Sequence, residues 1–396
     1  MIEDRVVRKL ITIFSKPRLC AVGLAALVAA CGGGVEVPTA PSIVAQGPLP
    51  QEERVIGDGS VTIAMLLPIT AGGSASGLAQ AFQNAAELAL DEVETDSVRI
   101  VVRDTGGETD KARAAAEASV TGGAQLILGP VFAPAVSGAA VATRSATVPL
   151  IGFSTDASLA GRGVYLLSFL PRQDATRIVQ YASEQGIRSF AGLVPDNGYG
   201  LVMEAAFREA VAARGGRVTT VERYAPGEID GAVSRLSAAG AFQALFVPNG
   251  GDDPAAAAAA LASRGVNTRL LGSGQWDNPA VLSAQGLSGA WFPGPREGSF
   301  QNFARRYQQK YGAEPPRTAS LVYDAALLAN GLVGARGGAA FSNRSLENAE
   351  GFVGVDGIFR LRSNGLSERG LAVYEATGGG NARTVSAAPT NFDRSF

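Results

Sequence analysis

The side chains that could carry out covalent or acid–base chemistry are few in this sequence. Its 396 residues include no histidine and two cysteines, Cys20 and Cys31. A Ser-His-Asp triad, a Cys-His pair, a histidine general base and His-ligated zinc are therefore excluded. The pair Asp252-Asp253 is better explained as the acidic first turn of a helix starting at Pro254 than as a metal site. We therefore expect a binding protein with no catalytic residue, cofactor or metal, rather than an enzyme.

Short polar runs that follow predicted strands indicate a ligand cleft instead. The most polar run is Ser154-Thr155-Asp156, whose hydroxyl and carboxylate oxygens could converge with backbone N–H groups on a polar ligand. The alternative is a turn in which Ser154 and Asp156 cap the following backbone. Trp276 could be a wall of the pocket or part of a core. The residues expected to line the cleft are Thr70, Phe132, Ser154, Thr155, Asp156, Asn197, Tyr199, Asn249 and Trp276.

The elements that must position these residues alternate between strands and helices from Val61 onward. Val61–Leu67 is a nearly continuous apolar run, as expected of a strand buried on both faces. Thr109 is expected to cap a helix over Asp110–Thr121. Two such series predict an α/β protein of two lobes, each a doubly wound parallel sheet, with a cleft at the carboxyl ends of the strands. Hinge closure around a ligand is a known use of such a cleft.

The division into lobes follows from chain length and from the order of the elements. The chain is longer than one hydrophobic core can serve, so two lobes are expected. We expect lobe 1 to comprise residues 59–172 and 298–338, and lobe 2 to comprise residues 173–297 and 339–376. Residues 377–396 are then a C-terminal tail.

The N-terminal residues have the pattern of an export signal. Basic residues such as Arg5, Arg8 and Lys9 precede the apolar run Leu19–Ala30. That run is too short to span about 30 Å of hydrocarbon but suits the core of a signal peptide over residues 1–30. Residues 32–58 are rich in proline and glycine without apolar periodicity, which predicts a flexible tether. The net charge of −2 gives no indication of a nucleic-acid surface.

The end of this signal, Leu27-Val28-Ala29-Ala30-Cys31, resembles the lipobox of bacterial lipoproteins. The resemblance implies that the Cys31 thiol accepts a diacylglycerol group, that Cys31 becomes the N-terminus, and that the protein is anchored to a membrane. Gly32, where an aspartate would act as a retention signal, implies the periplasmic face of the outer membrane. The alternative is an ordinary cleaved signal in which Cys31 lies by chance near an Ala-x-Ala site.

The body of the chain resembles type I periplasmic binding proteins, and in particular the leucine-binding-protein group. The resemblance covers about residues 59–376 and implies two lobes that close on a ligand like a Venus flytrap. It implies a role for Ser154-Thr155-Asp156 and Tyr199 in holding an amino acid. The segments that carry it are Val61–Pro68, Leu128-Gly129-Pro130, Val148–Ile151, Asp196–Gly200, Lys310–Pro315 and Tyr323-Asp324-Ala325.

A narrower similarity is to penicillin-binding protein activator lipoproteins, and it rests on Phe153–Pro171 and Glu368–Tyr374. It implies a non-catalytic regulator that contacts a peptidoglycan synthase, which is our main functional hypothesis. The alternative is the substrate-binding component of an ABC importer, which delivers an amino acid or similar small solute to a permease. The outer-membrane anchor argues against this alternative.

Two departures from the leucine-binding pattern leave the ligand open. Val131-Phe132-Ala133-Pro134 stands where the family usually has serine or threonine residues. Gly274 falls where the family often has an acidic partner for the ligand ammonium group, and an unpaired ammonium in a closed cleft is costly. Asp156 or Asp277 would have to replace that acidic residue.

Overall fold

The computed structural model describes residues 54–95, 97–296 and 298–392. The proposed signal peptide, Cys31 and nearly all of the proposed tether lie outside these ranges, so their predictions remain untested. Among the described residues, no helix has the length and apolar character needed to cross a membrane.

The first lobe is built on a sheet that has six strands within the described residues, in the order β1-β3-β2-β4-β5-β6. β1 runs antiparallel to β3, and the other neighbours are parallel. The strands are β1 (Val55–Ile56), β2 (Val61–Leu67), β3 (Val98–Asp104), β4 (Ile127–Leu128), β5 (Leu150–Gly152) and β6 (Val164–Leu166).

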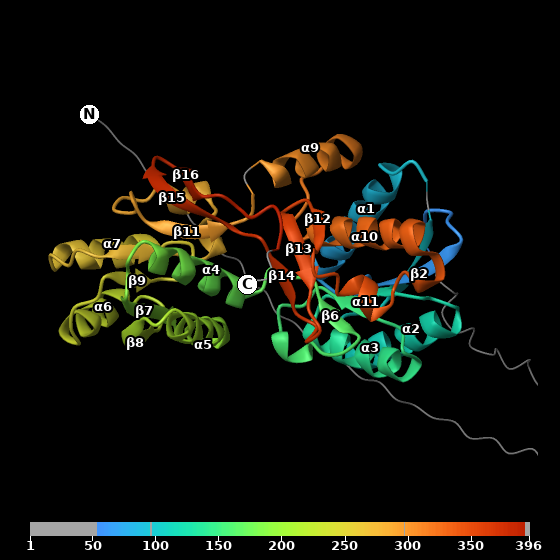
Figure 1. Cartoon of the computed structure of the whole chain (residues 1–396), viewed down its shortest axis with the longest axis horizontal. Helices are drawn as coiled ribbons and strands as arrows, with labels where there is room; N and C mark the ends of the chain where they lie inside the picture. The colour runs from blue at the N-terminus through green and yellow to red at the C-terminus, as the bar shows by residue number, and fades with distance from the viewer. Residues whose placement is uncertain (1–53, 96, 297, 393–396) are drawn as a thin grey trace, which may run out of the picture. The chain divides into compact units, whose positions relative to one another are not determined.

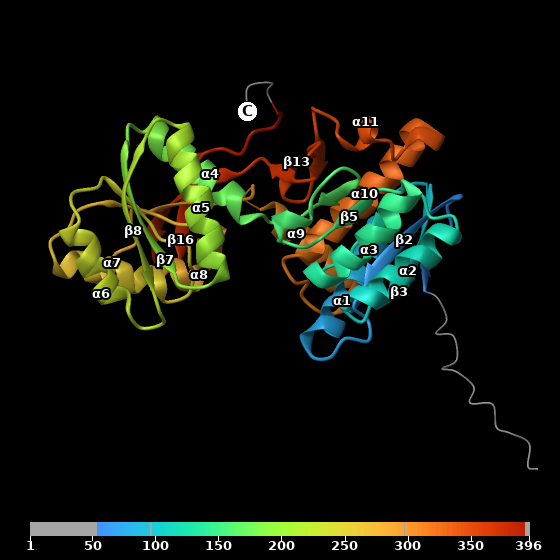
Figure 2. The same ribbon diagram turned by 90° about the horizontal axis from the view of Figure 1, so that it is seen from below.

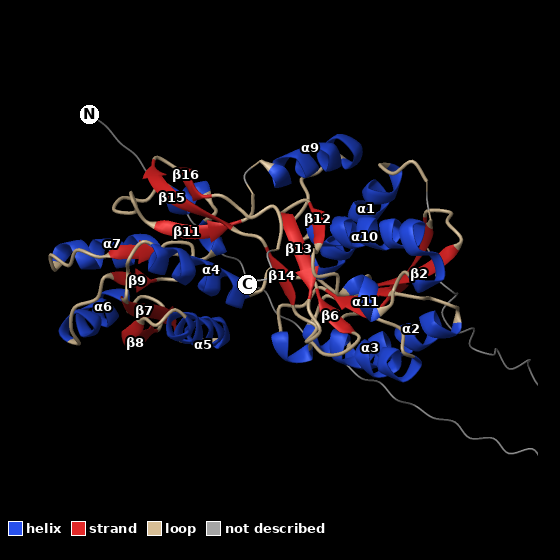
Figure 3. Ribbon diagram, viewed as in Figure 1, coloured by secondary structure: helices blue, strands red, loops and turns tan. Residues whose placement is uncertain are grey.

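Helices cover both faces of this first sheet (Figures 1 and 3). Along β2, Ile63 and Met65 belong to one buried cluster and Ala64 and Leu66 to another, so both faces of the strand are buried as predicted. The first cluster includes residues of α1, α9 and α10, and the second includes residues of α2 and α3. These helices are α1 (Ser74–Asp91), α2 (Thr109–Thr121), α3 (Ala133–Ala146), α9 (Ser299–Tyr311) and α10 (Ala319–Arg336).

The second lobe is built on a sheet of seven strands within the described residues, in the order β16-β15-β11-β10-β9-β7-β8. β15 and β16 are antiparallel to their neighbours, and the remaining pairs are parallel. The strands are β7 (Ser189–Pro195), β8 (Arg217–Tyr224), β9 (Ala244–Phe246), β10 (Arg269–Leu271), β11 (Trp291–Gly294), β15 (Ala372–Gly378) and β16 (Asn381–Ser386).

This second sheet also lies between two layers of helices. Phe246 stacks on Phe207 of α5 with ring centroids 4.8 Å apart, whereas its neighbour Leu245 packs into the opposite cluster with α6 and α7. The two lobes therefore confirm the predicted mixed α/β fold with parallel sheets. The helices of this lobe are α4 (Pro171–Glu184), α5 (Gly198–Ala213), α6 (Ile229–Ala238), α7 (Asp253–Ser263) and α8 (Pro279–Leu282).

A third sheet departs from the expected division of the chain. β12 (Phe352–Gly354), β13 (Gly357–Leu361) and β14 (Ser367–Arg369) form an antiparallel sheet that follows α11 (Asn343–Leu346). Phe341, Leu346 and Phe359 pack in the same buried cluster as α1 and α10 of the first lobe. The prediction that the chain returns to lobe 2 at residue 339 is therefore wrong, because these apolar side chains complete the first core; the return begins at β15.

Two further predictions differ from the structure. Residues 377–396 were expected to form a tail, but β16 pairs with β15 as the edge strand of the second sheet. Thr109 is the first residue of α2 rather than its cap, because Glu108 takes the cap position, where its side chain bonds Lys111 instead of the backbone.

Candidate functional site

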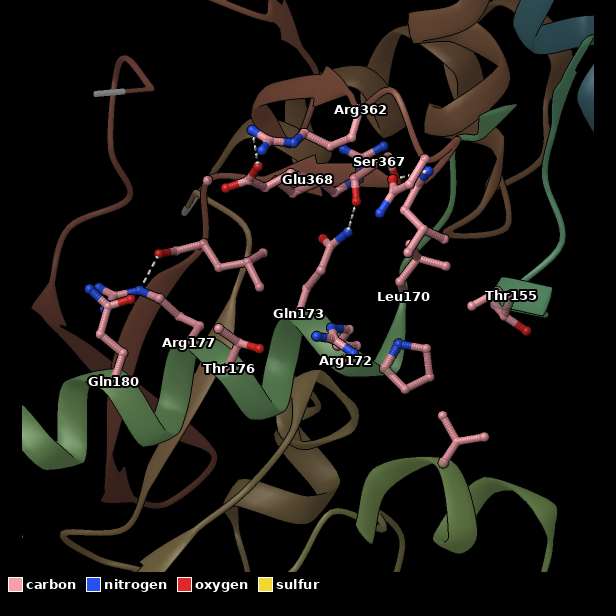
Figure 4. A pocket seen from close by; sticks show the side chains of 18 of the residues that line it. Thr155, Leu170, Arg172, Gln173, Thr176, Arg177, Gln180, Arg362, Ser367 and Glu368 are labelled. Atoms are coloured by element: carbon pink, nitrogen blue, oxygen red, sulfur yellow. Dashed lines mark hydrogen bonds and ion pairs between the residues drawn. The ribbon is translucent and has the colours of Figure 1, made fainter. Parts of the chain in front are cut away.

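A cavity of about 1010 Å³ brings part of the predicted cleft together with α4 and the chain after β13 (Figure 4). Thr155–Ser158, which follow β5, form one side of it. Gly198, Tyr199 and Val202, which follow β7, form another. Of the nine predicted residues, Thr155, Asp156 and Tyr199 line this cavity, and the other six do not.

The loop that follows β5 is held by its own hydrogen bonds. The Ser154 side chain is buried and its Oγ accepts a hydrogen bond from the Asp156 N–H at 3.2 Å. Asp156 Oδ1 accepts hydrogen bonds from the N–H and the hydroxyl of Ser158, at 3.0 and 2.7 Å, and so caps the short 3-10 turn η1 (Ala157–Leu159). The turn alternative is therefore formed at Ser154 and Asp156. Thr155 remains exposed at the cavity, with its hydroxyl available to a ligand.

The start of α5 places Tyr199 at the cavity. Asn197 Oδ1 accepts a hydrogen bond from the Gly200 N–H at 3.0 Å and caps the helix. The Tyr199 hydroxyl donates toward the carbonyl of Pro248 at 3.2 Å and lies 3.3 Å from Ser273 Oγ. Burial raises the pKa of Tyr199 to about 12, so the phenol is neutral at physiological pH. Tyr199 therefore offers a ligand its ring, while its hydroxyl is bonded inside the second lobe.

Asp174 is a functional candidate that the sequence alone did not indicate. Its Oδ2 accepts a hydrogen bond from the N–H of Gly274 at 2.8 Å, the position at which the chain lacks the acidic residue of the leucine-binding pattern. Burial raises the pKa of Asp174 to about 7, although the Gly274 hydrogen bond opposes this shift. Acidic residues are common in the first turn of a helix, because they interact favourably with the helix dipole. The sequence of α4 therefore gives no sign that Asp174 contacts Gly274.

Asn249 and Trp276 belong to the interior of the second lobe rather than to the cavity. The indole N–H of Trp276 donates to the carbonyl of Asn249 at 3.0 Å, and its side chain is fully buried in the core. Asn249 Nδ2 donates to Asp253 Oδ2 at 2.6 Å, and Tyr224 bonds the same oxygen. The core alternative for Trp276 therefore holds, and its selection as a cleft residue was wrong.

The first-lobe residues Thr70 and Phe132 lie on loops that do not line the cavity. Thr70 Oγ1 donates to Asp104 Oδ2 at 2.5 Å, which fixes the loop after β2 to the end of β3. Phe132 is 36% exposed and its ring lies against Gly107, so the ring does not occupy the cavity.

The polar side of α4 forms another wall of the cavity. Gln173 projects from α4 toward Ser367, and Arg177 and Gln180 project from the helix one and two turns further along (Figure 4). Gln173 donates to the carbonyl of Ser367 at 2.5 Å. Arg177 donates to the carbonyl of Leu371 at 2.8 Å and to the Ser386 hydroxyl at 2.5 Å. The helical spacing of these side chains was a signal in the sequence, but the partners of Gln173 and Arg177 lie about 200 residues further along.

Buried charges lie next to the cavity, because Asp324, Asp356 and Arg369 are buried and Arg369 also lines the cavity. Arg317 forms a two-point ion pair with Asp356, at 2.9 and 2.6 Å, and Asp356 is fully buried. Asp324 is 2% exposed, and burial raises its pKa to about 7, although the Arg369 charge opposes the shift. Among the described residues, no hydrogen-bond partner reaches the nitrogens of Arg369, whose guanidinium lies 5.0 Å from the ring of Phe169.

The chemistry of this site suits reversible binding. The lining combines the Thr155 hydroxyl, the Tyr199 ring and the apolar side chains of Leu170 and Val202 with the amides of α4. Such a mixture can hold a small molecule by apolar contact and orient it by a few hydrogen bonds. Within the described ranges, no cluster of three or more Asp, Glu or Cys residues is placed to hold a metal ion.

Comparison with known proteins agrees with this architecture. The family model "Periplasmic binding protein" matches residues 60–381. A search of curated protein sequences found no match to the chain. A structure described as a branched-chain amino acid ABC transporter from Rhodospirillum rubrum is 22% identical, with a TM-score of 0.72, over 82% of this chain and 99% of that one.

Two other solved structures are similar over the same region. An ABC transporter substrate-binding protein from Desulfitobacterium hafniense, in complex with Leu, is 19% identical with a TM-score of 0.58, over 82% of this chain and 99% of that chain. A solute-binding protein of an ABC transporter from Rhodopseudomonas palustris, in complex with benzoate, is 19% identical with a TM-score of 0.56, over 85% and 98%. At this identity the structures show a shared fold, and the family match covers most of the chain. The chain therefore belongs to the periplasmic binding protein family.

Proposed function

We propose that this chain is the solute-binding component of an ABC importer and that its solute is a small molecule bearing a carboxylate. The observation that carries the proposal is the cavity to which the loop after β5 of one sheet and the start of α5 after β7 of the other both contribute. This is the carboxyl-end placement at which open α/β sheets bind ligands. Leucine and benzoate, bound to two of the similar structures, both carry a carboxylate.

The groups at the cavity fit such a solute. The Thr155 hydroxyl and the polar side chains of α4 can donate hydrogen bonds to a carboxylate. The Tyr199 ring and Val202 offer apolar contact to an aliphatic or aromatic body. The charged residues of the lining are four arginines and three acidic residues, namely Arg172, Arg177, Arg362, Arg369, Asp156, Glu184 and Glu368. We therefore favour this role over the activator hypothesis.

A thermal-shift panel tests the proposal. The protein is first unfolded and refolded to remove bound solute. It is then melted with leucine, benzoate and 3,4-dihydroxybenzoate. Leucinamide and benzamide are the matched controls, because a neutral amide replaces the carboxylate in each. A solute that binds the folded chain stabilises it by about 2.7 kcal/mol at a hundredfold excess over its Kd. We expect a carboxylate to raise the melting temperature and its amide to have little effect. No shift with any of the carboxylates, or equal shifts with acids and amides, would contradict the proposal.

A second candidate is the regulatory contact with a peptidoglycan synthase. The observation that favours it is that the two activator-like segments, Phe153–Pro171 and Glu368–Tyr374, both contribute residues to this cavity, including Thr155 and Glu368. Under this hypothesis, a purified peptidoglycan synthase binds the chain and Glu368→Ala weakens that binding, whereas the solute panel gives no shift.

We also propose that Cys31 carries a lipid that anchors the protein to a membrane facing the periplasm. The support is the sequence Leu27–Cys31. Fatty-acid labelling should be lost in Cys31→Ser. Labelling that persists in this variant would contradict the anchor.

A further inference from the structure

The described chain ends in a segment that crosses from the second lobe to the third sheet. β16 ends at Ser386, opposite Val373 at the start of β15. From there the chain continues through Ala387 to Phe392 and runs toward β13 (Figure 2). We call Ala387–Phe392 the C-terminal strap. Within the described residues, it makes no backbone hydrogen bond to either sheet, so side-chain contacts must hold it.

The first part of the strap is attached to the second lobe. Ala388 packs against the buried cluster that contains Trp276 and Phe292. Just before the strap, the Ser386 hydroxyl accepts a hydrogen bond from Arg177 of α4 at 2.5 Å, and the same guanidinium donates to the carbonyl of Leu371. Arg177 therefore fixes both the start of the strap and the chain that enters β15.

The far end of the strap is attached to the first lobe through the third sheet. The Arg360 guanidinium of β13 lies 4.4 Å from the centre of the Phe392 ring. Arg360 is 5% exposed, and it is held by Glu368 at 2.8 Å and by the carbonyl of Ala349 at 3.1 Å. A cation held over an aromatic ring is attracted to its face, and more strongly when the pair is partly desolvated. Phe392 thus contacts a positioned, buried cation rather than a mobile surface side chain.

Two glycines leave room for the strap to pass. A Cβ at Gly351 would lie 2.8 Å from the Phe392 ring, and a Cβ at Gly370 would lie 2.9 Å from Pro389 Cγ. Both distances are shorter than side-chain carbons tolerate, so the strap lies directly on the backbone just before β12 and just after β14. The strap also lines the cavity, through Ala387, Pro389 and Phe392.

We propose that the C-terminal strap ties the edge of the second sheet to the third sheet and so limits how far the two lobes rotate relative to one another. The covalent connections between the lobes lie between β6 and α4, between β11 and α9, and between β14 and β15. The strap adds a non-covalent connection next to the last of these. This role does not depend on the solute and goes beyond the proposed transport function.

Hydrogen–deuterium exchange of the full chain without solute tests the strap. Phe392→Ala removes the ring above Arg360, and a chain ended after Asn391 removes the ring and all that follows. Asn391→Ala is the control, because Asn391 is an exposed neighbour. The reporter is the third sheet, where the Gly370 N–H bonds the carbonyl of Ile358 at 2.9 Å. We expect both Phe392 variants to exchange about three- to tenfold faster over 357–371, as the loss of a cation–π contact implies.

Amides of β2 and β7, inside the two lobes, should keep their exchange rates, and small-angle scattering should show a wider distribution of molecular dimensions. Asn391→Ala should match the unmodified protein in both measurements. Unchanged exchange over 357–371 in both Phe392 variants, or the same acceleration in Asn391→Ala, would overturn the proposal. Acceleration throughout both lobes would also overturn it, because Phe392 would then stabilise the fold in general.

Discussion

Replacing Asp174 with asparagine should change how stability depends on pH. Asp174 carries a carboxylate with a pKa raised by burial to about 7, compared with 3.8 for an unperturbed aspartate. Between about pH 4 and pH 7, the Asp174 carboxyl is therefore protonated in the folded protein and ionised in the unfolded chain. The free energy of unfolding should decrease as the pH rises through this window, because the folded state must then bury a charge.

The size of the effect follows from the shift. About three pKa units correspond to about 4 kcal/mol. Asp174 is half-buried, so solvent screens part of its charge, and we expect about 1–3 kcal/mol. An asparagine side chain at this position would keep an acceptor for the Gly274 N–H and would not ionise. Asp174→Asn should therefore match the unmodified protein near pH 4 and be more stable than it at pH 8.

Urea unfolding between pH 4 and pH 8.5 measures this difference directly. The difference between the two proteins should increase through the window and become constant above it. Parallel profiles, or a variant that is less stable at pH 8, would refute the assignment of a desolvated carboxylate at Asp174.

Three further substitutions test other parts of the structure. Asp324→Asn should also be more stable than the unmodified protein at pH 8, by up to about 4 kcal/mol, because Asp324 is 2% exposed. The same urea series measures this difference. Gly200→Ala should lower the free energy of unfolding by about 1–3 kcal/mol, because its Cβ would lie 1.8 Å from the carbonyl oxygen of Pro195; Gly198→Ala is the control, with no atom within 4 Å of its Cβ. Arg317→Met should cost about 3–5 kcal/mol, because the buried Asp356 would lose its cationic partner and keep only the hydrogen bond from Ser320. Adding Asp356→Asn should recover part of that loss. No recovery would indicate that lost packing, rather than the unpaired charge, causes the effect.

The central strands and helices could be predicted because their patterns are strong and local. Val61–Leu67 is apolar throughout, and it forms β2 with side chains in two cores. β16 was missed because it is a half-exposed edge strand whose polar residues, such as Asn381 and Arg383, give little alternation. The residue at which the chain returns to the second lobe was predicted wrongly, because an apolar strand pattern does not indicate which hydrophobic core the strand will join. Phe359 of β13 packs in the core of the first lobe.

The site could be predicted only in part, for a related reason. The rule that ligands bind where parallel strands end located Thr155, Asp156 and Tyr199 at the cavity. The same rule could not separate residues that face the cavity from those that bond inward, such as Trp276. Asp174 and Arg177 lie on a helix, and their partners at Gly274 and Ser386 are distant in the sequence. Contacts of that kind appear only when the chain is folded.

Calorimetric titration of the solute-free protein with a carboxylate of the panel and with its amide tests the proposed solute binding most directly. We predict saturable binding of one carboxylate per chain. The amide should bind at least about tenfold more weakly, a difference of about 1.4 kcal/mol. Tyr199→Ala and Thr155→Ala should weaken binding, whereas Leu201→Ala, an exposed neighbour that does not line the cavity, should not. Saturable binding that is equal for acid and amide, or unchanged in both cavity variants, would contradict it, as would no binding of any carboxylate at millimolar concentration.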